Sequence, residues 1–146
     1  MRKYLTLALC ISFILSGFSQ TDKAGSKDYG LLDRMPDYYI KKYSESEFEA
    51  FKFYLANSKN VVVEGRKFEI FYEHTQVKDK TIIKPGRIQI LRNYSNAIVK
   101  AGGQILMERH NGEYGNYQFK TPEGKEVWIQ VRPQRNGDRY LSLIHI

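Results

Sequence analysis

Cysteine is almost absent from this chain of 146 residues. The single one, Cys10, lies close to the N-terminus, and the sequence after it contains none. Disulfide bonds therefore cannot staple the body of the protein. We expect its fold to depend on ordinary packing of side chains around one core.

Patterns that carry chemistry are missing as well. No histidine stands with another histidine, a cysteine or a carboxylate at a spacing typical of metal ligands, and no serine lies in a G-x-S-x-G turn. Gly102-Gly103 lacks the pattern of a phosphate-binding loop, and the RNP-type string of an RNA-binding domain is absent. We therefore expect a non-catalytic protein with no metal, no cofactor and no nucleic-acid partner.

The N-terminus has the pattern of a signal peptide. A positive start, Arg2-Lys3, precedes the apolar run Tyr4–Leu15, and small residues occupy positions 17 and 19. The run has about half the length that spans a bilayer, so a retained membrane helix is the weaker interpretation. Lipidation of Cys10 is another alternative, but the residue before it is bulky. We predict that residues 1–19 are a signal peptide, cleaved after Ser19.

The other end of the chain also looks foreign to the domain. Residues 141–146 read LSLIHI, which the codons CTG TCT CTT ATA CAC ATC encode, and this is the transposon mosaic end used as a sequencing adapter. We predict that these residues are adapter-derived and that the natural chain continues beyond Tyr140. The alternative is a native apolar strand that spells the same letters.

About 120 residues lie between these two ends, enough for one domain with a single core. Residues 20–44 are predicted to form a flexible lead-in followed by an extended segment, which Pro36 interrupts. Residues 45–140 are regular and are predicted to form the domain itself.

Alternating apolar and polar residues predict strands, whose side chains point to opposite faces in turn. Such runs lie at 51–55, from Val61 to about His74, and at 104–109, 117–121 and 126–132. After Lys84-Pro85-Gly86 the period changes, and apolar residues recur every three or four positions, as on one stripe of a helix. The stripe contains Ile88, Leu91, Tyr94, Ile98 and Ala101. Gly102-Gly103 is predicted to end this helix, and Asn111-Gly112 and Glu123-Gly124 are predicted turns between the strands that follow. The predicted fold is α+β, with one amphipathic helix packed on a largely antiparallel sheet of about five strands.

Several short strings resemble the N-terminal domain of a group of OmpA-like cell-envelope proteins. They are Leu32–Pro36 (LDRMP), Glu64-Gly65-Arg66, and Ile90–Tyr94 (ILRNY) followed by Ala97 and Gly102-Gly103. The likeness covers roughly residues 28–140. In that group a small domain of unknown function precedes a C-terminal OmpA-like module that binds peptidoglycan, and that module is missing from this chain.

The resemblance implies an exported protein, periplasmic or associated with the outer membrane. Its parent would anchor the outer membrane or periplasmic components to peptidoglycan through the missing C-terminal module. The visible domain would be a non-catalytic N-terminal module whose ligand the resemblance does not assign.

The charge of the chain favours a second interpretation. The formal net charge is +7, and removal of Arg2 and Lys3 lowers it to +5 (7 − 2). A moderate basic excess suits an anionic envelope surface or glycan, although a mixed solvated surface also accounts for it. The alternative function is therefore a stand-alone secreted binding protein or adhesin for an anionic glycan or envelope ligand. A nucleic-acid binder is disfavoured by the export signal.

Two groups of residues are candidate ligand contacts. Arginine forks suit carboxylates and phosphates, so Arg66, Arg92 and Tyr94 form a candidate anion site for a glycan, peptide stem or lipid head group. The alternative is an internal ion pair from Glu64 to an arginine that fixes the helix to the sheet.

The second candidate is a sugar-stacking surface around Trp128, with Tyr114, Tyr117 and Phe119 beside it. Trp128 alternates with the apolar face of its strand, so it is predicted to point to the opposite side. Two alternatives remain for this ring: it is exposed to solvent, or the N-terminal segment covers it.

Overall fold

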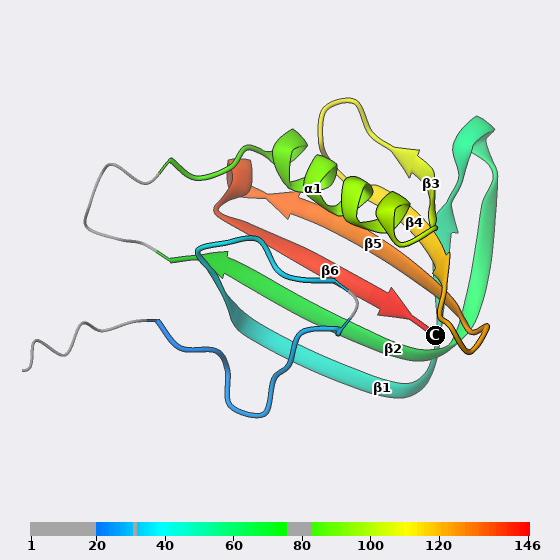
Figure 1. Ribbon diagram of the computed structural model, residues 1–146, viewed down its shortest axis with the longest axis horizontal. Coiled ribbons are helices and arrows are strands. Elements are labelled where there is room, and N and C mark those ends of the chain that lie inside the picture. The colour runs from blue at the N-terminus through cyan, green and yellow to red at the C-terminus, as the bar shows by residue number, and fades with distance from the viewer. Residues whose placement is uncertain (1–19, 31, 76–82) are drawn as a thin grey trace, which may run out of the picture.

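The computed structural model describes residues 20–30, 32–75 and 83–146, so the predicted signal peptide lies outside the described residues. Within these ranges, one helix packs on a sheet of six antiparallel strands in the order β1-β2-β6-β5-β4-β3 (Figure 1). The elements are β1 (Tyr38–Tyr54), β2 (Asn60–His74), α1 (Arg87–Lys100), β3 (Gln104–Glu108), β4 (Gly115–Lys120), β5 (Glu126–Gln134) and β6 (Arg139–His145), with short 3-10 turns η1 (Ala56–Ser58) and η2 (Arg135–Gly137). The α+β prediction is confirmed, with six strands in place of about five.

The strand β1 begins earlier in the sequence than the alternation indicates. It starts at Tyr38, directly after Asp37, whose positive φ of 63° turns the chain. A break in the pairing register between Ile40 and Lys42 marks a bulge in this strand. A bulge inserts one residue and reverses the alternation of faces, which hides the strand from a period-2 reading. Part of the segment predicted as an extended lead-in is therefore an edge strand.

The strand β6 occupies the middle of the sheet, between β2 and β5. Ser142 lies opposite Ile70 on one side and Val131 on the other, so β6 joins the two halves of the sheet. Ile144 and His145 are buried. The assignment of residues 141–146 to an adapter stays a prediction.

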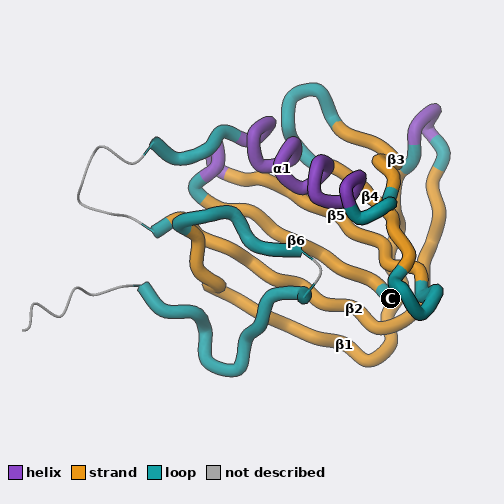
Figure 2. Tube along the Cα trace, in the orientation of Figure 1, coloured by secondary structure: helices purple, strands orange, loops and turns teal. Residues whose placement is uncertain are grey.

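The helix covers the face of β3, β4 and β5, as Figures 1 and 2 show. Its buried residues are Ile90, Leu91, Tyr94, Ser95 and Ile98. The predicted stripe is therefore right at its centre and wrong at its ends, because Ile88 is 54% exposed and Ala101 is exposed. The buried face also includes Ile90, which the predicted stripe omitted.

The predicted stop at Gly102-Gly103 is confirmed. Gly102 has a φ of 79°, and the N–H of Gly103 donates to Ile98 O at 2.8 Å, which closes the helix. A Cβ on Gly103 would lie 2.7 Å from the Cβ of Phe119. The glycine therefore also lets the chain pass close to β4.

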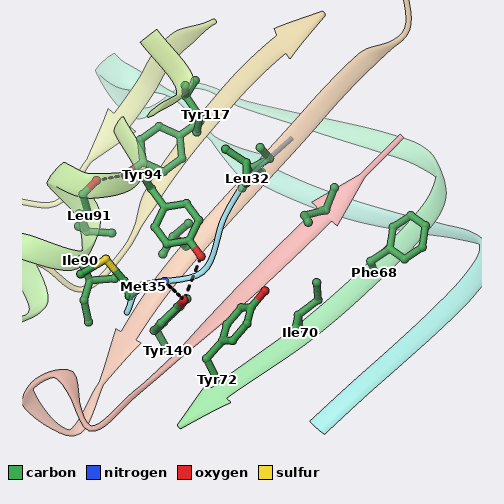
Figure 3. Packing of buried hydrophobic residues seen from close by; sticks show 14 of the residues in the cluster. Leu32, Met35, Phe68, Ile70, Tyr72, Ile90, Leu91, Tyr94, Tyr117 and Tyr140 are labelled. Carbon is green, nitrogen blue, oxygen red and sulfur yellow. Dashed lines mark hydrogen bonds between the residues drawn. The ribbon is translucent and has the colours of Figure 1, made fainter. Parts of the chain in front are cut away.

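The N-terminal segment lies across the same side of the sheet as α1 and completes the core. Its Met35 is buried, and the Met35 N–H donates to the hydroxyl of Tyr140 at 3.0 Å (Figure 3). Tyr140 stacks on Tyr72 with ring centroids 4.6 Å apart and packs edge-on against Tyr38 and Tyr94. A cluster of four tyrosines thus lies where the segment, the helix and the sheet meet.

Arg34 ties this segment to the sheet. Its guanidinium binds Asp28 at 2.6 Å and also pairs with Asp22, whose pKa it lowers by hydrogen bonding. The Tyr72 hydroxyl donates to the other oxygen of Asp28 at 2.7 Å. The N–H of Lys23 further donates to Ile40 O at 2.8 Å. The region predicted as a flexible lead-in is therefore held against β1 and β2.

The opposite face of the sheet is partly covered by the outer half of the β1–β2 hairpin, residues 46–65, called here the hairpin arm. Asn116 on β4 donates its side-chain N–H to Tyr54 O at 2.7 Å. Phe53, which is fully buried, packs against Trp128 of β5 with ring centroids 5.5 Å apart. The hairpin arm therefore curls over β4 and β5 on the side away from α1.

Candidate functional site

Arg66 forms an ion pair, but not with Glu64. Its guanidinium binds Glu45 of the neighbouring strand β1, and it lies 5.1 Å from the ring centroid of Phe68. Hydrogen bonding to Arg66 lowers the pKa of Glu45. Glu64 makes no ion pair with it. Arg66 is therefore engaged within the sheet, and the pair does not connect the sheet to the helix.

The other two residues of that candidate site, Tyr94 and Arg92, lie on opposite sides of α1. Tyr94 is buried, and its hydroxyl lies 3.1 Å from the hydroxyl of Tyr140 (Figure 3). Burial raises the pKa of Tyr94 well above its ordinary value. Arg92 lies on the exposed side of α1. The structure does not bring Arg66, Arg92 and Tyr94 into one site, and of the three only Arg92 is exposed without an ion-pair partner among the described residues.

The aromatic set around Trp128 is divided between the two faces of the sheet. Trp128 pairs in register with Gln118, whereas Tyr117 and Phe119 pair with Ile129 and Val127 on the face beneath α1. Trp128 is half-buried, and Phe53 of the hairpin arm covers it. The prediction that Trp128 points away from the apolar face is therefore right. The covering element is the hairpin arm, and the expected stacking surface with Tyr117 and Phe119 does not form.

Arg92 lines a pocket that was not predicted from the sequence. We call it the Arg92 pocket; its volume is about 240 Å³ and it lies between α1 and the end of β3. Its lining consists of Ile88, Leu91, Arg92, Glu108, Arg109 and His110. The Tyr117 hydroxyl donates to Glu108 Oε1 at 2.8 Å, which fixes this carboxylate at the pocket. Positive and negative groups thus face one small hollow.

A second pocket, the Arg132 pocket, has a volume of about 330 Å³. It is lined by Arg87, Glu113, Tyr114, Arg132, Pro133 and Gln134. The guanidinium carbons of Arg109 and Arg132 lie 5.6 and 5.7 Å from the ring centroid of Tyr114, within the range of a cation–π contact. Arg109 Nε also lies 3.4 Å from the Tyr114 hydroxyl. Tyr114 therefore connects one arginine of each pocket.

Residues of the turn between β3 and β4 line both pockets; the turn is the loop beside α1 in Figure 2. The N–H of Arg109 donates to Tyr114 O at 3.0 Å, and the N–H of Gly112 donates to Arg109 O at 2.9 Å. Gly112 is buried with a φ of 73°, and a Cβ on it would lie 2.9 Å from the Cβ of Arg87. The predicted Asn111-Gly112 turn is confirmed, and its glycine lets the turn rest on the start of α1.

The arginines of this region lack carboxylate partners. Among the described residues, no ion pair is made by Arg87, Arg92, Arg109, Arg132 or Arg135. A guanidinium keeps its charge at every physiological pH and presents planar donors that match carboxylate and phosphate oxygens. We call this region, formed by α1, the 109–114 turn and the β5–η2 corner, the arginine end. Its chemistry suits an anionic ligand.

The sequence contained a weak signal for this surface. Arg87 and Arg92 lie on a helix that contains no acidic residue, so neither can form an ion pair along the helix. Arg109 stands just before the Asn-Gly turn, and Arg132 lies on the polar side of the β5 alternation. The sequence could not indicate that these four residues line two adjacent pockets, because that arrangement requires the 109–114 turn to fold back onto α1.

No protein-family model matches the chain, and no curated protein matches it in a search. Across residues 20–30, 32–75 and 83–146, no cluster of three or more histidine, cysteine, aspartate or glutamate side chains is arranged to hold a metal ion. Within the same ranges, no helix is long and apolar enough to cross a membrane.

Proposed function

We propose that this domain is a non-catalytic binding module of an exported envelope protein, and that it holds an anionic ligand at the arginine end. One observation carries the proposal: unpaired arginines line two adjacent pockets, the Arg92 pocket and the Arg132 pocket. Each pocket is concave, so a bound anion would contact guanidinium groups from more than one direction.

The electrostatics support the binding of an anion. Like charges brought together by the fold repel one another, and this repulsion is relieved when an anion enters. Arginine binds carboxylates and phosphates through paired hydrogen bonds, which adds geometric selectivity to the attraction of charge. A ligand that carries several negative groups would gain most from the two pockets together.

The wider setting of the module rests on the sequence. The predicted signal peptide supports export, and the resemblance to OmpA-like envelope proteins supports a periplasmic or outer-membrane location. In this proposal the parent protein anchors envelope components to peptidoglycan through a C-terminal module beyond this chain. Sequencing the source locus through the codon for Tyr140 tests it, because the reading frame has to continue into such a module.

A stand-alone secreted binding protein or adhesin is the second candidate. The arginine end favours it specifically, because an anionic glycan or envelope ligand could be bound by the visible domain without any further module. A native stop codon after residue 146 would support this candidate and remove the anchor. The arginine end serves as the ligand surface in both proposals.

Binding to two polyanions of unrelated backbone, heparin and inorganic polyphosphate, tests the ligand surface. We expect the purified chain to bind both, with an affinity that falls as salt rises, because ionic contacts are screened. The double variant Arg92→Gln, Arg132→Gln should bind both more weakly. The matched control is the double variant Lys41→Gln, Arg66→Gln, which removes two positive charges from exposed residues that form ion pairs. Equal weakening by the control, or no weakening by the variant of Arg92 and Arg132, would contradict the proposal.

A further inference from the structure

The two pockets of the arginine end repeat one set of chemical groups. The Arg92 pocket presents Arg92 and Arg109 with one carboxylate, Glu108. The Arg132 pocket presents two arginines, Arg87 and Arg132, again with one carboxylate, Glu113. None of these carboxylates forms an ion pair with the arginines beside it.

This combination restricts the chemistry of the ligand. Guanidinium groups only donate hydrogen bonds, and an ionised carboxylate only accepts them. A group that satisfies either pocket therefore carries an anion and, close to it, a hydroxyl or amide that donates. A phosphate or sulfate group alone offers acceptors to the arginines and is repelled by the glutamate.

Glu108 is held ready for such a donor. Its Oε1 accepts the hydroxyl of Tyr117, which is buried beneath α1 and is therefore fixed in position. No hydrogen bond from the described residues reaches Oε2 of Glu108. One oxygen thus orients the carboxylate while the other remains for a ligand hydroxyl.

The two pockets are close enough to share one ligand. Ile88 lines the Arg92 pocket and the preceding residue, Arg87, lines the Arg132 pocket. Arg109 and Arg132, one from each pocket, both lie against the ring of Tyr114. A ligand that crosses the 109–114 turn therefore reaches both pockets without a long spacer.

We propose that the Arg92 and Arg132 pockets bind successive acidic sugars of an anionic glycan. Each acidic sugar supplies a carboxylate for the arginines and ring hydroxyls for the glutamate. This inference rests on the proposed anion-binding function and adds the class of the ligand and its two-pocket mode. A nucleic acid is the less favoured polyanion, because its backbone phosphates would meet Glu108 and Glu113.

Titration calorimetry of the purified chain tests the two-pocket mode, with galacturonate and mannuronate as monomers and as trimers. We expect at least one trimer to bind about tenfold or more tightly than its monomer, because the second sugar binds as part of the same molecule. Arg92→Gln should reduce the affinity for that trimer to about that of the monomer. Arg66→Gln should leave it unchanged.

Removal of the pocket carboxylates tests whether the glutamates accept hydrogen bonds from sugar hydroxyls. It also distinguishes the acidic-glycan inference from the more general proposal of anion binding. Glu108→Gln and Glu113→Gln should weaken the binding of the acidic trimer, because an acceptor is lost. The same changes should strengthen the binding of inorganic polyphosphate, because a repulsive charge is lost. Circular dichroism melts confirm that each variant is folded.

The remaining outcomes are decisive. If polyphosphate binds while both trimers bind no more tightly than their monomers, the glycan inference is overturned and the anion-binding function stands. If single-stranded DNA displaces the trimer at equal charge and binds more tightly, the glycan inference is likewise overturned. If neither polyphosphate nor any acidic sugar binds, both proposals fail together.

Discussion

The two ends of this domain use arginine in opposite ways. At one end, where the N-terminal segment meets β1 and β2, Arg34 and Arg66 each contact a carboxylate. We call this the paired end. At the arginine end, the arginines contact aromatic rings or solvent and no carboxylate of the described residues. The same residue type fixes the chain at one end and is left for another molecule at the other.

The difference follows from what lies beneath each set of charges. At the paired end, Arg34 bridges two aspartates above the tyrosine cluster, so its charge is compensated where water is partly excluded. At the arginine end the guanidinium groups stand beside open pockets, where water solvates them. A partly buried charge needs a partner in the fold, whereas a solvated one does not. Stability and ligand binding should therefore respond to different arginines.

The largest expected effect is a loss of stability when the tyrosine cluster is opened. Tyr140→Ala removes a fully buried ring that stacks on Tyr72 and should lower the free energy of unfolding by about 3–5 kcal/mol. Tyr114→Ala, at the arginine end, removes a partly exposed ring and should have a much smaller effect. Urea denaturation of both variants measures the difference. Equal losses would mean that the core does not lie mainly at the paired end.

The second prediction compares one arginine from each end. Arg34→Ala leaves Asp22 and Asp28 without their cation and should lower the free energy of unfolding by about 1–3 kcal/mol. Arg92→Ala should change it by about 0.5 kcal/mol or less, because Arg92 has no partner to lose. Thermal melts of both variants give the comparison. A larger loss from Arg92→Ala than from Arg34→Ala would refute the division into two ends.

The third prediction concerns acid. Arg34 lowers the pKa of Asp22, and hydrogen bonding by Tyr39 lowers that of Glu73. A carboxyl group whose pKa is lower in the folded state stabilises the fold above its unfolded pKa, about 3.9 for aspartate. That stability is lost as the pH falls through the folded pKa.

The melting temperature should therefore stay high as the pH falls to about 5 and decrease below about 4. Asp22→Asn should make this decrease smaller, since the variant has one fewer lowered carboxyl pKa. Asp33→Asn is the control, because Asp33 is exposed and forms no ion pair among the described residues. If the melting temperatures of both variants decreased with pH as that of the parent protein does, the ion pair of Asp22 would contribute nothing to the stability that is lost in acid.

The smallest expected effect is an electrostatic gain at the arginine end. Arg132→Gln removes one of several neighbouring positive charges and should raise the free energy of unfolding by about 0.5 kcal/mol or less at low salt. The gain should disappear at high salt, where the repulsion is screened. Urea denaturation at two salt concentrations measures it. A gain that persists at high salt would have to come from packing and not from charge.

Much of the fold could be predicted because its signals are local. The periodicity located α1 and most of the strands, and Gly102 and Gly112 marked the end of the helix and a turn. Strand order is not a local property, so the central position of β6 between β2 and β5 could not be inferred. The start of β1 was missed because its bulge near Lys41 reverses the alternation.

The candidate site shows the same limit. The alternative of an ion pair from Glu64 to an arginine did not anticipate the pair of Arg66 with Glu45. The pairing of β1 with β2 brings these two residues together, and the sequence of either strand alone does not reveal that register. Tyr94 was assigned to a surface although its position on the apolar stripe of α1 indicated burial. Arg92 was selected correctly as a candidate for an open arginine, but its neighbours Arg109 and Glu108 come from a strand that only the folded chain brings to it.

The position of β6 has a consequence for the order of folding. The hairpin of β1 and β2 and the meander of β3, β4 and β5 share no strand pairing until β6 enters between them. The ladder between β2 and β6 joins residues far apart in the chain, such as Lys67 and His145, whereas the ladder between β5 and β6 joins two consecutive strands. Long-range pairing of the first kind slows folding. A polypeptide that is still emerging therefore holds two separate half-sheets, and a single late strand closes the sheet and makes unfolding cooperative.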